Sequence, residues 1–199
     1  DPPYVPQDIP CGAYVHTFDY SRDENATKAF LNFEGVDSCF YVWINGSYVG
    51  YGQVSHMTSE FDITDLLQDG TNTVAVLVMK WCDGSYLEDQ DKFRMSGIFR
   101  DVYILKRPEQ TIRDYHIKTK IEGMLAKVEL DMKFYSPANV KISIEDRNGA
   151  VVAVGSISED GTSVLEIASP ELWNTENPYL YKLILETEHE VIVDHIALR

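Results

Sequence analysis

Short runs of β-branched and aromatic residues, separated by clusters of turn residues, recur along the whole chain, and no long stretch has a helical pattern. Such runs predict an all-β protein, because strands are short and rich in these residue types. Only residues 64–67 are expected to form a helix, of one turn. The expected strands of the first half are residues 14–20, 28–33, 38–44, 73–81 and 99–105.

One of these runs, TVAVLVMKW at residues 73–81, is apolar on both faces. Valines alternate with alanine, leucine and methionine, a composition typical of a strand in the middle of a sheet. Asn45-Gly46 lies between two other strand-like runs, YVWI and SYVGYG. It predicts a type I′ hairpin turn, because both residues of that turn need positive φ. The Asn45 amide could also face a ligand hydroxyl.

A boundary is expected near Pro108, where Lys106-Arg107-Pro108-Glu109 ends the last strand of the first group. We therefore predict two β-domains, residues 1–107 and residues 108–199. Seven short strands with intervening turns predict an immunoglobulin-like sandwich for the second domain. These strands are expected at residues 115–121, 126–134, 140–145, 151–156, 163–167, 180–186 and 191–197.

Charge and cysteine usage exclude several classes of partner. The formal net charge of -15 argues against nucleic acid, which requires a basic face, and against an anionic membrane surface. No apolar run approaches the ~20 residues of a membrane span, and the first residues lack the features of a signal peptide. The three cysteines, Cys11, Cys39 and Cys82, have no metal-binding spacing. They predict reduced, mostly buried thiols in a cytoplasmic protein.

The segment DGSYLEDQD, residues 83–91, holds four carboxylates and is called here the acidic segment. It does not fit the ligand spacing of an EF-hand. A solvated loop is one interpretation, because like charges repel. However, Tyr86 and Leu87 interrupt the acids and Phe93 follows them. The second interpretation is therefore a loop that folds against protein and offers a carboxylate to a sugar.

Four runs carry a family resemblance: WINGSYVGYGQ, SEFDITDLL, KWCDGSYLEDQDKFRMSGIFRDVYIL and LWNTENPYLY. They resemble the N-terminal part of the β-galactosidases of glycoside hydrolase family 2, and the match covers nearly the whole chain. The glucuronidases and mannosidases of that family lack the acidic segment followed by RMSGIFRDV. The resemblance implies a jelly-roll sugar-binding domain and then an immunoglobulin-like domain, without the catalytic TIM barrel.

The resemblance also implies roles for single residues. Asn45 would contact the galactosyl unit, and Asp91 would bind a galactose hydroxyl and a sodium ion. Both would then lie at the same end of the first domain. Asp83 would belong to a peripheral magnesium site whose other ligands lie outside this chain. Val54 stands where the family has Asp, at the expected rim of the substrate pocket.

No residue of this chain is expected to be catalytic, because the acid/base and nucleophilic glutamates belong to the barrel. The parent protein would be a retaining β-galactosidase that uses magnesium and sodium, acts on galactosides such as lactose and forms a homo-oligomer. The fragment itself would be inactive and require no cofactor. The acidic segment would complete the active site of the C-terminal barrel, anchored by its apolar residues.

Two alternatives come from other functional classes. A free-standing carbohydrate-binding module would need an exposed aromatic platform and useful affinity of its own. A purely structural pair of β-sandwiches would have no pocket near Asn45 and Asp91.

Overall fold

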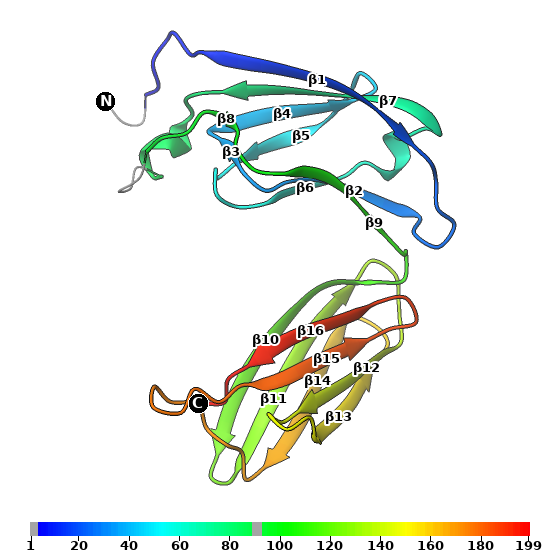
Figure 1. Ribbon diagram of the computed structural model, residues 1–199, viewed down its shortest axis with the longest axis vertical. Coiled ribbons are helices and arrows are strands. Elements are labelled where there is room, and N and C mark those ends of the chain that lie inside the picture. Colours follow the sequence, from blue (N-terminus) through cyan, green and yellow to red (C-terminus); the bar gives the residue numbers. More distant parts are fainter. Residues whose placement is uncertain (1–3, 89–92) are drawn as a thin grey trace. The chain divides into compact units, whose positions relative to one another are not determined.

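The computed structural model describes residues 4–88 and 93–199, and Figure 1 shows their arrangement into strands. Every element of more than four described residues is a strand, so the all-β prediction is confirmed. Contacts divide the chain into unit 1 (Asp1–Arg107) and unit 2 (Pro108–Arg199). Among the described residues, no helix is long and apolar enough to cross a membrane.

Unit 1 contains a four-stranded antiparallel sheet in the order β1-β7-β4-β5. The expected central strand is β7, which lies between β1 and β4 as predicted. Its Val76 and Val78 are buried, which places one of its two apolar faces in the core. The bounds are β1 (Cys11–Tyr20), β4 (Cys39–Ile44), β5 (Ser47–Gln53) and β7 (Gly70–Met79).

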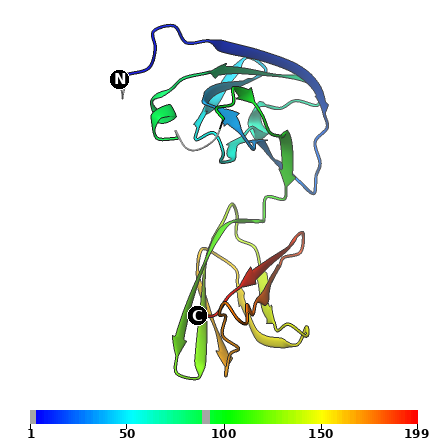
Figure 2. The same cartoon turned by 60° about the vertical axis from the view of Figure 1, so that its left-hand side comes forward.

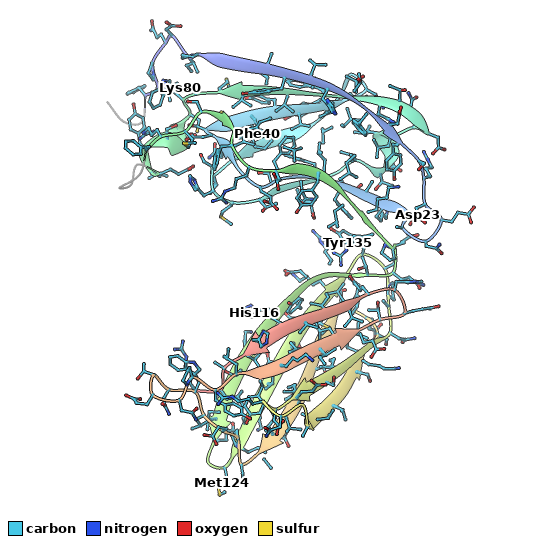
Figure 3. The ribbon with its side chains drawn as sticks, viewed as in Figure 1. Asp23, Phe40, Lys80, His116, Met124 and Tyr135 are labelled. Carbon is cyan, nitrogen blue, oxygen red and sulfur yellow. The ribbon has the colours of Figure 1, made fainter. Side chains whose placement is uncertain are left out.

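A second sheet, in the order β6-β2-β9, closes the core of unit 1. Phe33 of this sheet packs on Phe40 of the first, with ring centroids 4.8 Å apart, and Figure 3 shows Phe40 between the sheets. This packing forms the predicted sandwich. The bounds are β2 (Lys28–Phe33), β6 (Ser59–Asp62) and β9 (Val102–Arg107), with a small ladder of β3 (Val36–Asp37) and β8 (Gly97–Ile98).

The predicted helical turn is confirmed as the 3-10 helix η1 (Thr64–Leu66). The Thr64 hydroxyl does not cap it as its position would suggest. Instead, Thr64 Oγ1 accepts the backbone N–H of Ala29 at 3.0 Å, which ties η1 to β2.

Unit 2 has the seven strands and the two-layer arrangement of an immunoglobulin-like sandwich. Figure 2 shows the sheet β10-β11-β14 facing the sheet β13-β12-β15-β16. Val128, Leu130 and Met132 alternate on β11 and are fully buried. The bounds are β10 (Ile112–Glu122), β11 (Leu125–Phe134), β12 (Val140–Glu145), β13 (Val151–Ile157), β14 (Gly161–Ala168), β15 (Tyr181–Glu186) and β16 (Val191–Ile196).

Candidate functional site

The acidic segment begins as a compact turn. It follows β7, whose end is marked by Lys80 in Figure 3, and opens with the 3-10 helix η2 (Asp83–Tyr86). Ser85 Oγ accepts the Cys82 N–H at 3.1 Å, and the N–H groups of Leu87 and Glu88 both donate to Gly84 O at 3.0 Å. The described part of the segment is therefore a hydrogen-bonded turn. Asp91 lies outside the described residues.

Polar contacts anchor this turn to the rest of unit 1. Glu88 Oε2 accepts the N–H of Ser55, a buried residue that follows β5, at 2.9 Å. Tyr86 Oη donates to the carbonyl oxygen of Tyr4 at 2.5 Å. Arg94 donates to the carbonyl oxygen of Ser85 at 2.9 Å, so both described flanks of residues 89–92 are held near η2.

Leu87 and Phe93 do not anchor the acidic segment to unit 1, so the expected apolar anchoring is wrong within this chain. Leu87 is 87% exposed and Phe93 is 93% exposed. The turn is closed by Ser85 and by backbone hydrogen bonds, which leaves these two side chains in solvent. Sequence reasoning missed the anchor because Glu88 and Ser55 lie far apart in the chain.

A cavity of about 290 Å³ lies beside η2. The Arg94 guanidinium lies 5.3 Å from the ring centroid of Trp81, which is one wall of this cavity. The cavity combines an indole surface with hydrogen-bonding groups, a combination that suits small polar ligands. Its lining residues are Val5, Pro6, Trp81, Cys82, Ser85, Tyr86 and Arg94.

Two thiols lie beside this cavity: Cys82 lines it, and Cys39 is the neighbour of Cys82. Cys39 and Cys82 are free and buried, as predicted, whereas Cys11 is exposed. Burial, and to a lesser extent the neighbouring Cys82, raises the pKa of Cys39 to about 11. The Cys39 thiol is therefore protonated at neutral pH and is a poor nucleophile.

Asn45 and Gly46 form the predicted hairpin turn between β4 and β5, with φ of 52° and 82°. The Asn45 side chain has structural contacts there. Its Nδ2 donates to Leu66 O at 2.9 Å and to Asn72 Oδ1 at 2.8 Å, and its Oδ1 accepts the Thr73 N–H at 2.9 Å. The amide thus joins the hairpin to the end of η1 and to the first residues of β7.

The strand register places this turn and η2 at opposite ends of the sheet. Ile44 pairs with Val74 of β7, whereas Cys39 pairs with Met79, shortly before η2. Five residues of strand span roughly 17 Å, so Asn45 and Asp83 do not meet. Because Asp91 lies outside the described residues, its predicted meeting with Asn45 stays a prediction.

Asp83 does not form a metal site with other described residues. Its Oδ1 accepts the Gly84 N–H at 2.8 Å, and its side chain is exposed. Across residues 4–88 and 93–199, no group of three or more His, Cys, Asp or Glu residues could hold a metal ion. Magnesium needs about six oxygen ligands, so a site at Asp83 would need ligands from elsewhere.

Family models match both parts of the chain. Residues 1–108 match "Glycosyl hydrolases family 2, sugar binding domain", and residues 110–199 match "Glycosyl hydrolases family 2".

Two similar proteins are β-galactosidases. The chain is 45% identical to the β-galactosidase of Staphylococcus xylosus over 200 residues and 45% identical to that of Actinobacillus pleuropneumoniae over 203 residues. Each match covers 100% of this chain and 20% of the relative. The chain therefore spans about one fifth of the length of these curated relatives.

Solved structures of more distant proteins share the fold. An FMN-binding β-glucuronidase from Facaelibacterium prausnitzii L2-6 has a TM-score of 0.82 at 20% identity, covering 96% of this chain and 33% of that one. A Ruminococcus gnavus β-glucuronidase has a TM-score of 0.78 at 20% identity, covering 96% and 35%. These likenesses show the fold alone, whereas the family models, which span nearly every residue, show that the chain belongs to glycoside hydrolase family 2.

Proposed function

We propose that this chain is the N-terminal, non-catalytic part of a retaining β-galactosidase that hydrolyses terminal β-D-galactosides such as lactose. The observation that carries the proposal is the 45% identity to two β-galactosidases across the whole chain, against 20% to the β-glucuronidases of the same fold. The catalytic carboxylates would then lie in the part of the parent protein outside these residues.

In this proposal, the acidic segment reaches from unit 1 toward the catalytic barrel. Its base is held by Glu88 and Arg94, and its exposed Leu87 and Phe93 supply apolar surface for contact with the barrel. Burying two such side chains against a partner would stabilise the contact by a few kcal/mol, on the order of 2 kcal/mol each. Asp91 would bind a galactose hydroxyl and a sodium ion at the tip.

The other site residues have weaker support. Both N–H groups of the Asn45 amide bond to η1 and β7, so a contact with the galactosyl unit would have to use the remaining lone pair of its oxygen, which also accepts the Thr73 N–H. Asp83 would supply one carboxylate to a magnesium site completed by other parts of the parent enzyme. That enzyme would be a cytoplasmic homo-oligomer, and its sodium and magnesium would be bound mainly outside the described residues.

The first experiment measures hydrolysis of a chromogenic β-galactoside by the purified chain. Retaining hydrolysis needs two carboxyl groups about 5–5.5 Å apart, one of them an acid with a raised pKa. In the proposed enzyme both groups belong to the barrel, so we expect no turnover by this chain. We also expect no galactose binding tighter than about 1 mM, because two polar contacts of about 1 kcal/mol each are too weak. Turnover by the chain alone would contradict the proposal.

The second experiment uses the parent enzyme. Asp91→Ala should lower kcat/KM by roughly 100-fold or more, because a hydroxyl contact in a desolvated site strengthens in the transition state. Asp65→Ala, an exposed aspartate of η1, is the matched control and should keep normal kinetics. Near-normal kinetics of Asp91→Ala would remove Asp91 from the substrate site.

A further inference from the structure

Two free, buried thiols, Cys39 and Cys82, have no role in the proposed function. Cys39 is the first residue of β4, and Cys82 directly precedes η2, at the base of the acidic segment. The third cysteine, Cys11, is exposed. Because Cys39 and Cys82 are far apart in the sequence, only the tertiary structure brings them together.

Backbone hydrogen bonds hold the two cysteines in one corner of unit 1. Cys39 pairs with Met79 across the β4–β7 ladder, and the preceding residue, Ser38, donates from its Oγ to Lys80 O at 2.7 Å. Lys80, where the chain leaves β7, is marked in Figure 3. Cys82 lies two residues beyond Lys80, and two residues of chain span at most about 7 Å. The backbone of Cys82 is therefore kept close to the start of β4.

Side-chain contacts place the two sulfur atoms on the same face of the sheet. Cys39 lies directly opposite Gln53 of β5, and opposite residues of an antiparallel pair share a face. A methyl group at Gly84 of η2 would lie 3.4 Å from Gln53 Nε2 and 3.6 Å from Cys82 Sγ. The turn thus covers this face, with the Cys82 sulfur among the side chains around Cys39. In agreement with this placement, Cys82 contributes to the raised pKa of Cys39.

The two thiols differ in access. Cys82 lines the cavity beside η2, whereas Cys39 is 1% exposed and lies behind it. Ser85 Oγ is 3.7 Å from Cys82 Sγ, and a hydroxyl at this place can donate to a thiolate, the reactive form of cysteine. A small oxidant that enters the cavity therefore meets Cys82 first and finds Cys39 beside it, the arrangement of a reactive cysteine with a resolving one.

We propose that Cys39 and Cys82 form a reversible disulfide, which ties β4 to the base of the acidic segment when hydrogen peroxide enters the cavity. The Cys82 sulfur attacks a peroxide oxygen, the O–O bond breaks, and the leaving hydroxide takes the thiol proton, which gives a sulfenic acid and water. The Cys39 sulfur then attacks the Cys82 sulfur. The S–O bond breaks as the S–S bond forms, and the second hydroxide leaves as water with the Cys39 proton.

The contact between the thiols makes the second step possible. Burial keeps Cys39 protonated, so this thiol does not react with peroxide by itself. Once Cys82 is a sulfenic acid, the attack by Cys39 is intramolecular, and its high effective concentration compensates for the weak nucleophile. A thiol reductant reverses the modification by thiol–disulfide exchange. This inference is independent of the proposed function.

The test treats the reduced 199-residue chain with excess hydrogen peroxide, removes the peroxide, and labels the remaining thiols with N-ethylmaleimide under denaturing conditions. Intact mass spectrometry should show a loss of two hydrogen atoms and a single label, in place of the three labels on the untreated chain. A non-reducing digest should contain a cross-linked peptide that joins Cys39 to Cys82. Dithiothreitol should restore all three labels.

Three outcomes of the wild-type experiment would overturn the proposal. In the first, Cys39 and Cys82 both keep their labels while the exposed Cys11 is oxidised, which is the behaviour of inert core thiols. In the second, the cross-linked peptide joins Cys11 of two chains. In the third, Cys82 is oxidised to a sulfinic acid without a cross-link, which would show that Cys39 cannot reach it.

Variants test the order of the two steps. Cys39→Ala should leave Cys82 as a sulfenic acid that dimedone traps, whereas Cys82→Ala should leave Cys39 unmodified. Cys11→Ala is the matched control and should form the cross-link normally. Dimedone labelling of Cys39 in Cys82→Ala, with none of Cys82 in Cys39→Ala, would contradict access through the cavity. Circular dichroism checks that each variant is folded, and the wild-type peptide map needs no variant.

Hydrogen exchange measures the physical effect of the cross-link. The closed loop lies wholly within unit 1, so the disulfide constrains the unfolded state of that unit. Peroxide should therefore slow exchange in unit 1 and leave unit 2 unchanged, and Cys39→Ala should abolish the difference. Neither this result nor the peptide map affects the proposed function, which is tested by hydrolysis in the parent enzyme.

Discussion

The two units present different outer surfaces. In unit 2, the outward face of the β10-β11 ladder carries ion pairs, with Glu122 bound to both Lys120 and Lys127 at 2.7 Å. Elsewhere on unit 2, exposed valines such as Val154 and Val193 face outward. In unit 1, the outward face of the β1-β7-β4-β5 sheet has exposed aromatic residues, among them Tyr48 and Tyr51. In both units, buried apolar residues alternate with outward residues along the strands. The two units therefore differ in the residues on the outward faces of their sheets.

This difference indicates a division of roles. The β10-β11 ladder, with apolar residues inside and charged residues outside, needs no further cover on its outward face, which suits a structural role. A sheet that is apolar on both faces leaves one face available for a ligand or another part of the protein. In unit 1, Tyr48 and Tyr51 lie on that face.

The largest expected effect is in the core of unit 2. Leu130→Ala removes a fully buried side chain of β11 and should lower the free energy of unfolding of unit 2 by about 3 kcal/mol. Hydrogen exchange followed by mass spectrometry reports each unit separately. Protection of unit 1 should be unchanged if the units unfold independently.

Val154→Ala, on the exposed side of β13, is the control and should change stability by less than about 0.5 kcal/mol. Equal loss of protection in both units would show that the two units do not unfold independently.

The next effect is in the polar network of unit 1. Asn72 is buried, and its side chain exchanges hydrogen bonds with Gln68, Gly70 and Asn45. Asn72→Ala should cost about 2 kcal/mol, because several partners lose their hydrogen bonds. Thermal denaturation measures the change. Asn148→Ala, in an exposed turn of unit 2, should be nearly neutral. A neutral Asn72→Ala variant would show that the network does not hold the hairpin.

A smaller effect, of opposite sign in the two units, is expected at two valines. Val54 has a φ of 76°, a left-handed conformation that β-branched residues disfavour. Val54→Asn should therefore stabilise the chain by about 1 kcal/mol, because asparagine tolerates this conformation. Val154→Asn replaces a valine in extended β13 and should destabilise by up to about 1 kcal/mol. Denaturant titration of both variants measures the two changes, and loss of stability in both would argue against strain at Val54.

The smallest effect concerns pH. Hydrogen bonds from Lys120 and Lys127 lower the pKa of Glu122 from its ordinary 4.5 to about 2. A depressed pKa in the folded state stabilises the fold above about pH 4.5, and the contribution disappears as pH falls through about 2. Glu122→Gln should lower the melting temperature slightly at pH 7, and the difference should vanish at about pH 2 or in about 1 M salt. Glu159→Gln, also exposed, is the control, and a difference that persists in high salt would contradict an electrostatic cause.

Local patterns were enough to predict much of the fold. Each of the seven strands of unit 2 was predicted, because turn residues separate runs that alternate between buried and outward residues. The Asn45-Gly46 turn was predicted for a similarly local reason, since its conformation depends on two adjacent residues. The short strands β3, β6 and β8 were not predicted, because two to four residues carry too little pattern.

The candidate site depended on contacts that no local pattern contains. The pairing of Cys39 with Met79 and of Ile44 with Val74 decides that Asn45 and η2 lie at opposite ends of the sheet. Likewise, the bond from Ser55 to Glu88 decides how the acidic segment is anchored. The sequence determined which residues form strands and which strand is central, because periodicity and turn chemistry act over a few residues. Only the tertiary structure decided which loops meet and which apolar face stays exposed, because register and packing join residues far apart in the chain.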